Sequence, residues 1–207
     1  MRCYGDLTPA RHLACLLAAL LMFAMSPAWR ADAADRDVGP RPAGQFDYYV
    51  LSLSWVPGFC ATHRRHPAEC GKGLGFALHG LWPQLNGGDY PSDCDAAALT
   101  PSEIQRYRDL YADPSLIEHE WPKHGTCSGL QPARYFALSA RDLRRVRIPA
   151  GYGSGAFLAA TDTRSVRSAF LAANPGMPVG AMTTTSAKGM LTGVDICLAK
   201  NGDFRSC

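Results

Sequence analysis

The sequence has little charge of either sign, no long apolar run and no Cys-x-x-Cys pair. Charged residues make up 19% of the 207 residues, and 21 Lys and Arg against 18 Asp and Glu leave a net charge of +3. So small an excess argues against a protein that binds nucleic acid through bulk electrostatics, so any partner must be recognised by a local site. With 47% hydrophobic and 10% aromatic residues, the composition is that of one globular domain.

The longest uncharged apolar run is Leu13–Met25, which follows Arg2 and Arg11 and precedes the small residues of 28–34. This pattern is typical of a secretory signal peptide, and the run is shorter than the ~20 residues that span a bilayer. The alternatives are a membrane anchor and a lipoprotein acceptor at Cys15, which lies at the start of the run instead of after it. We predict a signal peptide over residues 1–33, cleaved within 31–34, with export to the periplasm or beyond the cell and no stable membrane association afterwards.

Two of the eight cysteines lie in the predicted signal peptide, and its removal leaves 18 basic and 16 acidic residues, a net charge of +2. An even number of cysteines in an exported chain predicts three disulfides, with the pairing left open. Zinc is the competing interpretation, but an oxidising compartment favours bridges over thiolate ligands, and the chain lacks a Cys-x-x-Cys knuckle. We therefore expect no metal and no cofactor. The six remaining cysteines are Cys60, Cys70, Cys94, Cys127, Cys197 and Cys207.

The sequence pattern predicts three strands. In the first, Tyr48–Trp55, alternate residues share one face, and Pro57-Gly58 stops the strand. The other two strands are predicted at 75–81 and at Met190–Leu198, and polar loops at 62–73 and 183–189. The dipeptide Asn201-Gly202 favours a type I′ hairpin, which would place position 197 opposite 206 and allow Cys197 and Cys207 to bridge. The face shared in the first strand carries Tyr49, Leu51, Leu53 and Trp55.

Helices are predicted at 101–112, within 115–125, around 132–146 and around 161–173. The first opens on Thr100-Pro101-Ser102-Glu103, a capping box with proline at the first helical position. Residues 34–45 mix proline, glycine and charge, which predicts a flexible entry segment before a domain over 46–207. Strands first, helices next and strands last indicate a single α+β domain, an antiparallel β-sheet with helices packed against it and disulfides that stabilise it.

Two dense clusters hold three of the histidines, at 76–84 and at 119–127, whereas His63 and His66 lie in a polar loop. Helical spacing would gather the polar residues of the second cluster into one patch, for which a solvated helix face is the alternative, and Pro122 weakens the helix prediction. A zinc-protease helix needs histidines at i and i+4. His119 and His124 are five apart, about 140° around a helix, which excludes that motif.

The two clusters supply what acid–base chemistry on a phosphodiester needs. One imidazole, near its ordinary pKa of about 6.5, can take a proton from an oxygen while a second, protonated imidazole gives one to the leaving oxygen. Lys123 and a protonated His119 can supply positive charge around the phosphorane-like transition state. RNA brings its own nucleophile, the 2′-hydroxyl, so the first step requires neither a metal ion nor an activated water.

Both clusters resemble the active-site segments of the ribonuclease T2 family of secreted endoribonucleases. The first is Phe76-Ala-Leu-His79-Gly-Leu-Trp82-Pro83, and the second is His119-Glu120-Trp121-Pro122-Lys123-His124-Gly125-Thr126-Cys127. The segments 51–60, 89–94 and 195–197 are also similar to the family, especially to its bacterial members. The resemblance runs from about Phe46 to Cys207 and implies cleavage of RNA, but not of DNA, by a monomeric enzyme with low base specificity that needs no metal.

The resemblance implies a role for seven residues. His79 and His124 would be the acid–base pair, Glu120 and Lys123 the groups that stabilise the transition state, and His119 a phosphate-binding residue. Trp82 and Tyr90 would stack on bases, although Trp82 is equally interpretable as a core residue. Where some members place an acid after Trp-Pro, this chain has Gln84, which leaves base preference open.

The family also implies disulfides between Cys60 and Cys70, Cys94 and Cys127, and Cys197 and Cys207. A catalytically silent RNA-binding or interaction member of the same fold is the alternative function. Three arginines of the predicted helix 132–146 share a face that can steer RNA, but a solvated face is the favoured interpretation. They are Arg141, Arg144 and Arg145.

Overall fold

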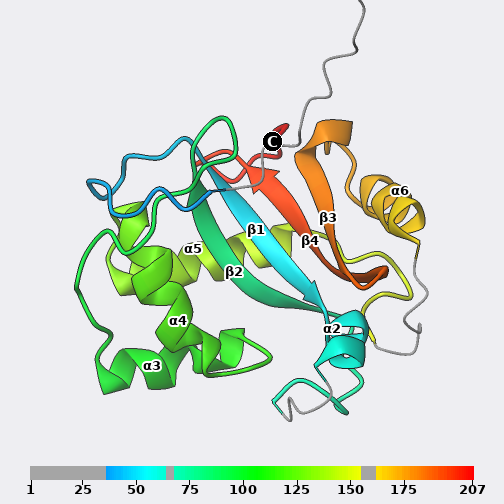
Figure 1. Cartoon of the computed structure of the whole chain (residues 1–207), viewed down its shortest axis with the longest axis horizontal. Helices are drawn as coiled ribbons and strands as arrows, with labels where there is room; N and C mark the ends of the chain where they lie inside the picture. Colours follow the sequence, from blue (N-terminus) through cyan, green and yellow to red (C-terminus); the bar gives the residue numbers. More distant parts are fainter. Residues whose placement is uncertain (1–35, 64–67, 155–161) are drawn as a thin grey trace, which may run out of the picture. The chain divides into compact units, whose positions relative to one another are not determined.

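A computed structural model describes residues 36–63, 68–154 and 162–207 of the chain (Figure 1). The predicted signal peptide and His66 lie outside the described residues. Four strands form one antiparallel sheet in the order β2-β1-β4-β3. Within these described residues, no helix is long and apolar enough to cross a membrane. The strands are β1 (Tyr48–Trp55), β2 (Phe76–Gln84), β3 (Met182–Ala187) and β4 (Met190–Leu198).

All four predicted helices are present, and the α+β fold is confirmed. Thr100 caps α3 by accepting the Glu103 amide N–H, so the capping box forms, but the α-helix ends at Tyr107 and a 3₁₀ turn, η1 (Arg108–Leu110), follows. A helix that the sequence did not predict, α2, follows β1 directly. Pro57 occupies its first turn, where a missing N–H is tolerated. The helices are α2 (Val56–Thr62), α3 (Pro101–Tyr107), α4 (Leu116–Lys123), α5 (Pro132–Arg145) and α6 (Thr163–Ala173), with short 3₁₀ turns η2 (Gly125–Ser128) and η3 (Val179–Ala181).

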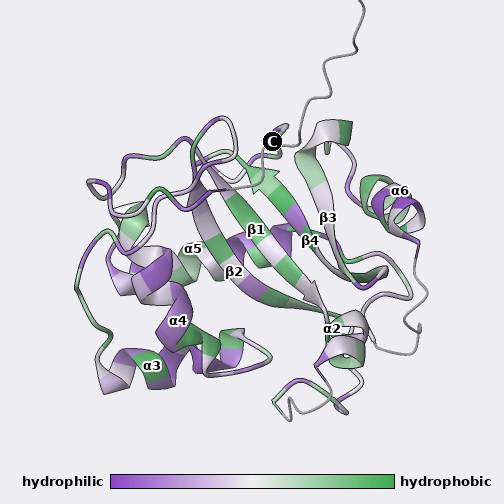
Figure 2. Ribbon diagram, in the orientation of Figure 1, coloured by the Kyte–Doolittle hydropathy of each residue, from purple (hydrophilic) through white to green (hydrophobic). Residues whose placement is uncertain are grey.

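The main core lies between one face of the sheet and the helices that cover it. The alternating residues of β1 predicted to share a face are all 3% exposed or less, and they pack with apolar side chains of α4, α5 and α6. Helix α5 crosses behind the sheet, and the strands carry much of the hydrophobic colour (Figures 1 and 2). The helical contributors are Ile117 and Trp121 of α4, Tyr135 and Phe136 of α5, and Val166 and Phe170 of α6.

A second, smaller apolar cluster covers the opposite face. Tyr48, Val50 and Cys197 are buried there, and Trp82 packs against them. The Arg205 guanidinium lies 4.4 Å from the centroid of the Tyr48 ring. Apolar side chains therefore cover both faces of the sheet around Tyr48 and Cys197. Trp82 is the residue of β2 that packs in the smaller cluster.

The predicted polar loop 183–189 is wrong, because residues 182–187 form the edge strand β3. Its outward positions are polar and exposed, so the apolar alternation that marks a strand is weak. Lys188 (φ 52°) and Gly189 (φ 75°) join β3 to β4 as a two-residue loop between the paired residues Ala187 and Met190. Positive φ at both positions is the requirement of a type I′ hairpin. The type I′ hairpin of this chain therefore lies at Lys188-Gly189, between β3 and β4.

At Asn201-Gly202 the predicted two-residue turn is wrong by one position. Ala199 pairs with Asp203, and Leu198 with Phe204, so three residues form the loop and only Gly202 has positive φ (89°). The Arg205 amide donates to the Cys197 carbonyl, so position 197 lies opposite 205 and not 206.

Three disulfides close loops in the described chain, with the pairing that the family resemblance implies. Cys60 bonds Cys70, Cys94 bonds Cys127, and Cys197 bonds Cys207, at Cα–Cα distances of 5.6, 4.9 and 5.3 Å. The second bridge closes the longest loop, 33 residues, and ties the segment after α4 to the segment after Tyr90.

Candidate active site

The first histidine cluster lies on β2 at a β-bulge. Ser52 pairs with Gly80 and Leu53 with Leu78, so His79 has no partner in the β1 register. Bulges re-aim side chains, and this one keeps both Leu78 and Leu81 in the main core although they are three residues apart. The His79 ring consequently faces away from that core. Its Nδ1 hydrogen-bonds the Ser54 Oγ of β1 at 3.1 Å, and its Nε2 lies 3.6 Å from Oε1 of Glu120.

Glu120 of α4 is the buried centre of the site, with 0% exposure. Its Oε2 accepts a hydrogen bond from the Trp82 indole N–H at 2.7 Å, while its Oε1 faces His79. The interpretation of this cluster as a solvated helix face is therefore wrong. Gly80 makes the approach possible, because a Cβ on that residue would lie 2.0 Å from Oε2 of Glu120 and 2.3 Å from the Trp82 indole nitrogen.

His124 stands directly after α4 and leaves the helix, with φ −123° and ψ −45°. Pro122 is retained inside the last turn of the helix, directly before its final residue, Lys123. The His124 ring is buried, with its centroid 5.1 Å from that of Trp82 and 5.8 Å from that of Tyr90. Trp82 in turn lies 5.4 Å from the His79 ring. The structure thus brings the two histidine clusters together around Trp82 and Glu120.

His119 is exposed and its ring lies 6.4 Å from that of His124. One donor atom each from His119, Glu120 and His124 lie within 4.8 Å of one another, a donor set that can hold a divalent ion. The angle of about 140° between His119 and His124 holds only for a continuous helix, and His124 lies outside α4, so helical spacing does not exclude a metal here. Both Glu120 oxygens already face Trp82 and His79, which limits their availability to an ion.

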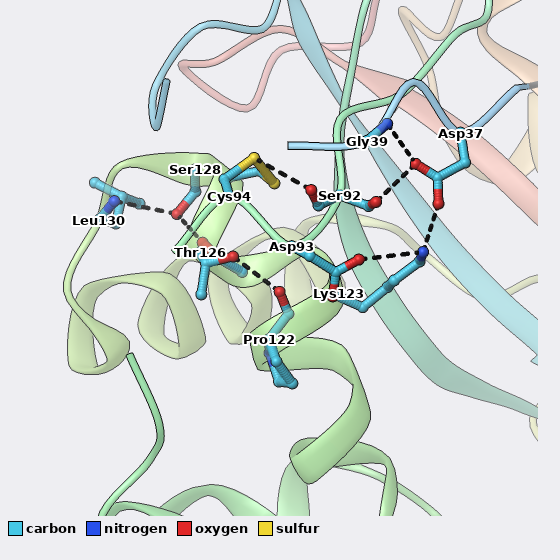
Figure 3. Close-up of a disulfide and its surroundings, with 12 residues drawn as sticks. Asp37, Gly39, Ser92, Asp93, Cys94, Pro122, Lys123, Thr126, Ser128 and Leu130 are labelled. Carbon is cyan, nitrogen blue, oxygen red and sulfur yellow. Dashed lines mark hydrogen bonds and ion pairs between the residues drawn. A yellow bond between two sulfur atoms is a disulfide. The ribbon is translucent and has the colours of Figure 1, made fainter. Parts of the chain in front are cut away.

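Lys123 does not point freely into the site. Its ammonium hydrogen-bonds Asp37 at 2.5 Å and Asp93 at 3.5 Å, as Figure 3 shows. These bonds raise the pKa of Lys123, whereas the bond from Lys123 is the main cause that lowers the pKa of Asp37 to about 2. At any ordinary pH the lysine is therefore charged and held between two carboxylates.

Tyr90 is half-buried beside His124, and Trp82 both packs on the smaller apolar cluster and faces the site, so the two interpretations of Trp82 are compatible. Gln84, by contrast, is only 2% exposed, and its Oε1 has no hydrogen-bond partner among the described residues. Its amide does not face the site's surface.

Burial dominates the electrostatics of this cluster. It raises the pKa of Glu120 to about 8, opposed by the hydrogen bond from Trp82. It lowers the pKa of His124 to about 3, with His119, Lys123 and His79 adding to the effect, and it lowers the pKa of His79 with a further contribution from His119. Perturbed titratable groups that converge in this way are characteristic of active sites.

Four residues that touch the site were missed by sequence reasoning: Ser54, Gly80, Asp37 and Asp93. Gly80 was visible inside the first motif, but its function depends on how closely Glu120 approaches. Asp37 lies in the segment predicted to be a flexible entry and reaches a lysine 86 positions away. The arginines of α5 belong to its solvated face, where Arg141 pairs with Asp142, and Arg145 with Asp203.

The model of the ribonuclease T2 family matches residues 46–207, most of the chain. The chain belongs to the ribonuclease T2 family. It is similar to a "Ribonuclease" of Aeromonas hydrophila, 49% identical over 105 residues that cover 51% of this chain and 48% of that protein. It is also similar to "Ribonuclease 1" of Arabidopsis thaliana, 34% identical over 100 residues that cover 40% and 43%. The chain spans about half the length of the curated relatives it matches.

Solved structures of this family share the fold. Ribonuclease MC1 from bitter gourd seeds matches with a TM-score of 0.59 at 24% identity, covering 78% of this chain and 94% of that one. Trichomaglin, described as an S-like ribonuclease, matches with a TM-score of 0.63 at 22% identity, covering 79% and 92%. At these identities the likeness concerns the fold alone.

Proposed function

We propose that the protein is an exported endoribonuclease that cleaves RNA by 2′-hydroxyl transphosphorylation, with low base specificity and without a metal ion. The observation that carries the proposal is the convergence of His79, Glu120 and His124 from two separate segments around one tryptophan. Membership of the ribonuclease T2 family supports it. A variant of the related ribonuclease MC1 has been crystallised in complex with 5′-UMP, which supports a nucleotide ligand for this fold.

The reaction proceeds in two steps. His124 takes the proton of the 2′-hydroxyl, whose oxygen bonds to phosphorus as the bond from phosphorus to the 5′-oxygen breaks, and His79 protonates that leaving oxygen. The product is a 2′,3′-cyclic phosphate. His79, now neutral, then takes a proton from water, whose oxygen opens the cycle, and His124 returns its proton to the 2′-oxygen to leave a 3′-phosphate.

The remaining groups stabilise charge and bind the chain. Glu120 and Lys123 stabilise the phosphorane-like transition state, and His119, exposed beside His124, binds phosphate. Trp82 and Tyr90 stack on bases, a contact worth ~1 to 3 kcal/mol per base that tolerates any base. Since Gln84 is buried, base-edge recognition by its amide has no support, which favours low base specificity.

The test is product analysis on ribodinucleoside phosphates and their 2′-deoxy counterparts, with and without EDTA. We expect 2′,3′-cyclic and then 3′-phosphate ends from the ribose substrates alone, unaffected by EDTA. His79→Ala and His124→Ala should each lower kcat by at least ~100-fold, the range of general acid–base catalysis. His63→Ala is the matched control, because His63 stacks on Phe59 outside the site.

Three outcomes would contradict the proposal. Activity lost in EDTA and restored by a divalent ion would assign the His119, Glu120 and His124 donor set to a metal. Full activity in either histidine variant would remove the acid–base pair. RNA binding without turnover at any pH from about 4 to 8, a range that spans histidine titration, would favour the silent RNA-binding member instead.

A further inference from the structure

Residues Arg36–Gly39, here called the N-terminal strap, lie beside the segment that carries Tyr90. The Tyr90 amide donates to the Arg36 carbonyl at 2.9 Å, and the Tyr90 carbonyl accepts from the Val38 amide at 3.0 Å. Asp37 and Tyr90 form a parallel bridge. Both backbone groups of Tyr90 are thus satisfied by the strap. The strap precedes the region 46–207 that the family model covers.

The Asp37 side chain joins the strap to α4. Its Oδ1 accepts from the Gly39 amide at 2.9 Å and from the Ser92 hydroxyl at 2.6 Å, and its Oδ2 accepts from the Lys123 ammonium at 2.5 Å (Figure 3). Ser92 is buried, at 2% exposure. Two hydrogen bonds, from Gly39 and from Ser92, therefore hold the Asp37 carboxylate in place independently of its contact with Lys123.

Lys123 is the last residue of α4, and its long, flexible side chain is 27% exposed. Its ammonium therefore needs a partner that fixes its position. Its ammonium has three N–H donors, of which Asp37 and Asp93 engage two within the described part of the chain. A third N–H remains available to a substrate oxygen. Stabilisation of a transition state depends on donors that are already oriented, so a fixed ammonium is worth more than a mobile one.

We propose that Asp37 is a positioning residue, which orients the Lys123 ammonium toward the scissile phosphate and locks the strap against Tyr90. This role rests on the function proposed above. The opposite role, a carboxylate that competes with phosphate for Lys123, predicts the opposite change in rate, so kinetics separates the two.

The test is steady-state cleavage of a ribodinucleoside phosphate by Asp37→Asn. Asparagine keeps an acceptor for Gly39 and Ser92 but removes the charge that holds the ammonium. We expect kcat to fall about tenfold or more while KM changes less than about twofold, because the group acts in the transition state. Asp93→Asn is the comparison variant: it removes the same charge from the same lysine at a longer distance, so kcat should fall by a clearly smaller factor than in Asp37→Asn.

A double variant shows whether Asp37 acts through Lys123. If it does, Asp37→Asn combined with Lys123→Met should be no slower than Lys123→Met alone, whereas an independent structural defect would add to it. Ser92→Ala, which removes one donor to the Asp37 carboxylate, should lower kcat in the same direction by a smaller factor. Circular dichroism melts of each variant confirm that it is folded under assay conditions.

An unchanged or raised kcat in Asp37→Asn would overturn the positioning role, and a raised value would identify a competitor of phosphate. Equal losses in Asp37→Asn and Asp93→Asn would also overturn it, since charge alone would then explain the effect. A wild-type protein that cleaves no RNA contradicts the proposed function. An active wild type with an equally active Asp37→Asn contradicts the positioning role alone.

Discussion

At the scale of single residues, burial disfavours the charged forms of three groups at the centre of the site, Glu120, His124 and His79. Glu120 is fully buried, and the adjacent imidazoles lose hydration as well, so burial disfavours charge on all three. The lowered pKa of His124 keeps this residue neutral, as a base must be before it accepts a proton. The lowered pKa of His79 restricts the protonated form, which the proposed acid requires, to acidic pH.

These shifts predict an acidic pH optimum. The proposed acid, His79, must be protonated, and its pKa lies below the ordinary 6.5, so kcat/KM should fall as pH rises through a value below 6.5. The proposed base, His124, must be neutral, and its pKa of about 3 places the acid limb at low pH. We expect the maximum of kcat/KM between these limits, measured on a ribodinucleoside phosphate, with His63→Ala unchanged. A maximum at or above neutral pH would show that the acid is not a histidine with a lowered pKa.

The residues with intrinsic chemistry were predictable from the sequence, and those that act by proximity were not. Histidines that are close in the sequence indicate acid–base chemistry by themselves. Nothing in the sequence distinguishes Asp37 from the other aspartates, because its role depends on its contact with Lys123 in the fold. The burial of Glu120 was missed for the same reason. Spacing along a helix tells which residues share a face, but what covers that face depends on β2, contributed by a distant segment.

At the scale of elements, the bulge in β2 and the end of α4 are the two local irregularities that build the site. A regular β2 would have placed either Leu78 or Leu81 outside the core, and a longer α4 would have turned His124 away from His119. β2 lies at the edge of the sheet. An edge strand also tolerates Pro83, which has no N–H to donate to a neighbouring strand.

The close approach of α4 to β2 makes Gly80 a sensitive position. In Gly80→Ala the new Cβ would overlap the Glu120 carboxylate and the Trp82 indole, which must both move. Because displacements of about 1 Å can cost ~100-fold, we expect kcat/KM to fall by about that factor, together with a lower melting temperature. Gly153→Ala is the control, since a Cβ there meets nothing within 4 Å. Wild-type kcat/KM in Gly80→Ala would mean that Glu120 and Trp82 are not held together during turnover.

Strong local sequence signals predicted most helices and strands correctly. The predictions failed for segments whose structure depends on pairing with a distant strand. The capping box placed α3, and aromatic alternation placed β1. The edge strand β3 has an exposed polar face, so only its pairing with β4 identifies it. Asn201-Gly202 is a strong hairpin signal, yet the chain there forms a three-residue loop, and the two-residue turn lies at Lys188-Gly189. Lysine seldom adopts positive φ, so no sequence rule would have selected it.

At the scale of the whole molecule, the three disulfides link the site to the chain's compartment. The bridge between Cys94 and Cys127 closes 33 residues and joins the segments that carry Tyr90 and His124, while the other two each close 10. Loop-closure entropy assigns about 3.7 kcal/mol to the longer loop and about 2.7 kcal/mol to each shorter one. A chain with reduced cysteines would lose this stabilisation, so full stability requires an oxidising environment.

We therefore predict that the disulfides form when the chain is exported and do not form when export is blocked. Expressed in a bacterium, the full chain should appear in the periplasmic fraction with an N-terminus generated by cleavage within residues 31–34 and with all six remaining cysteines bridged, as read by N-terminal sequencing and non-reducing mass spectrometry. Leu17→Arg with Leu20→Arg interrupts the apolar run, so this variant should stay in the cytoplasm, uncleaved and reduced. Both changes lie outside the domain, so the domain of the cytoplasmic product has the same sequence as that of the exported product and lacks its bridges. An unprocessed wild-type chain in the membrane fraction would assign Leu13–Met25 to an anchor instead. A processed chain with free thiols would remove the link between compartment and stability.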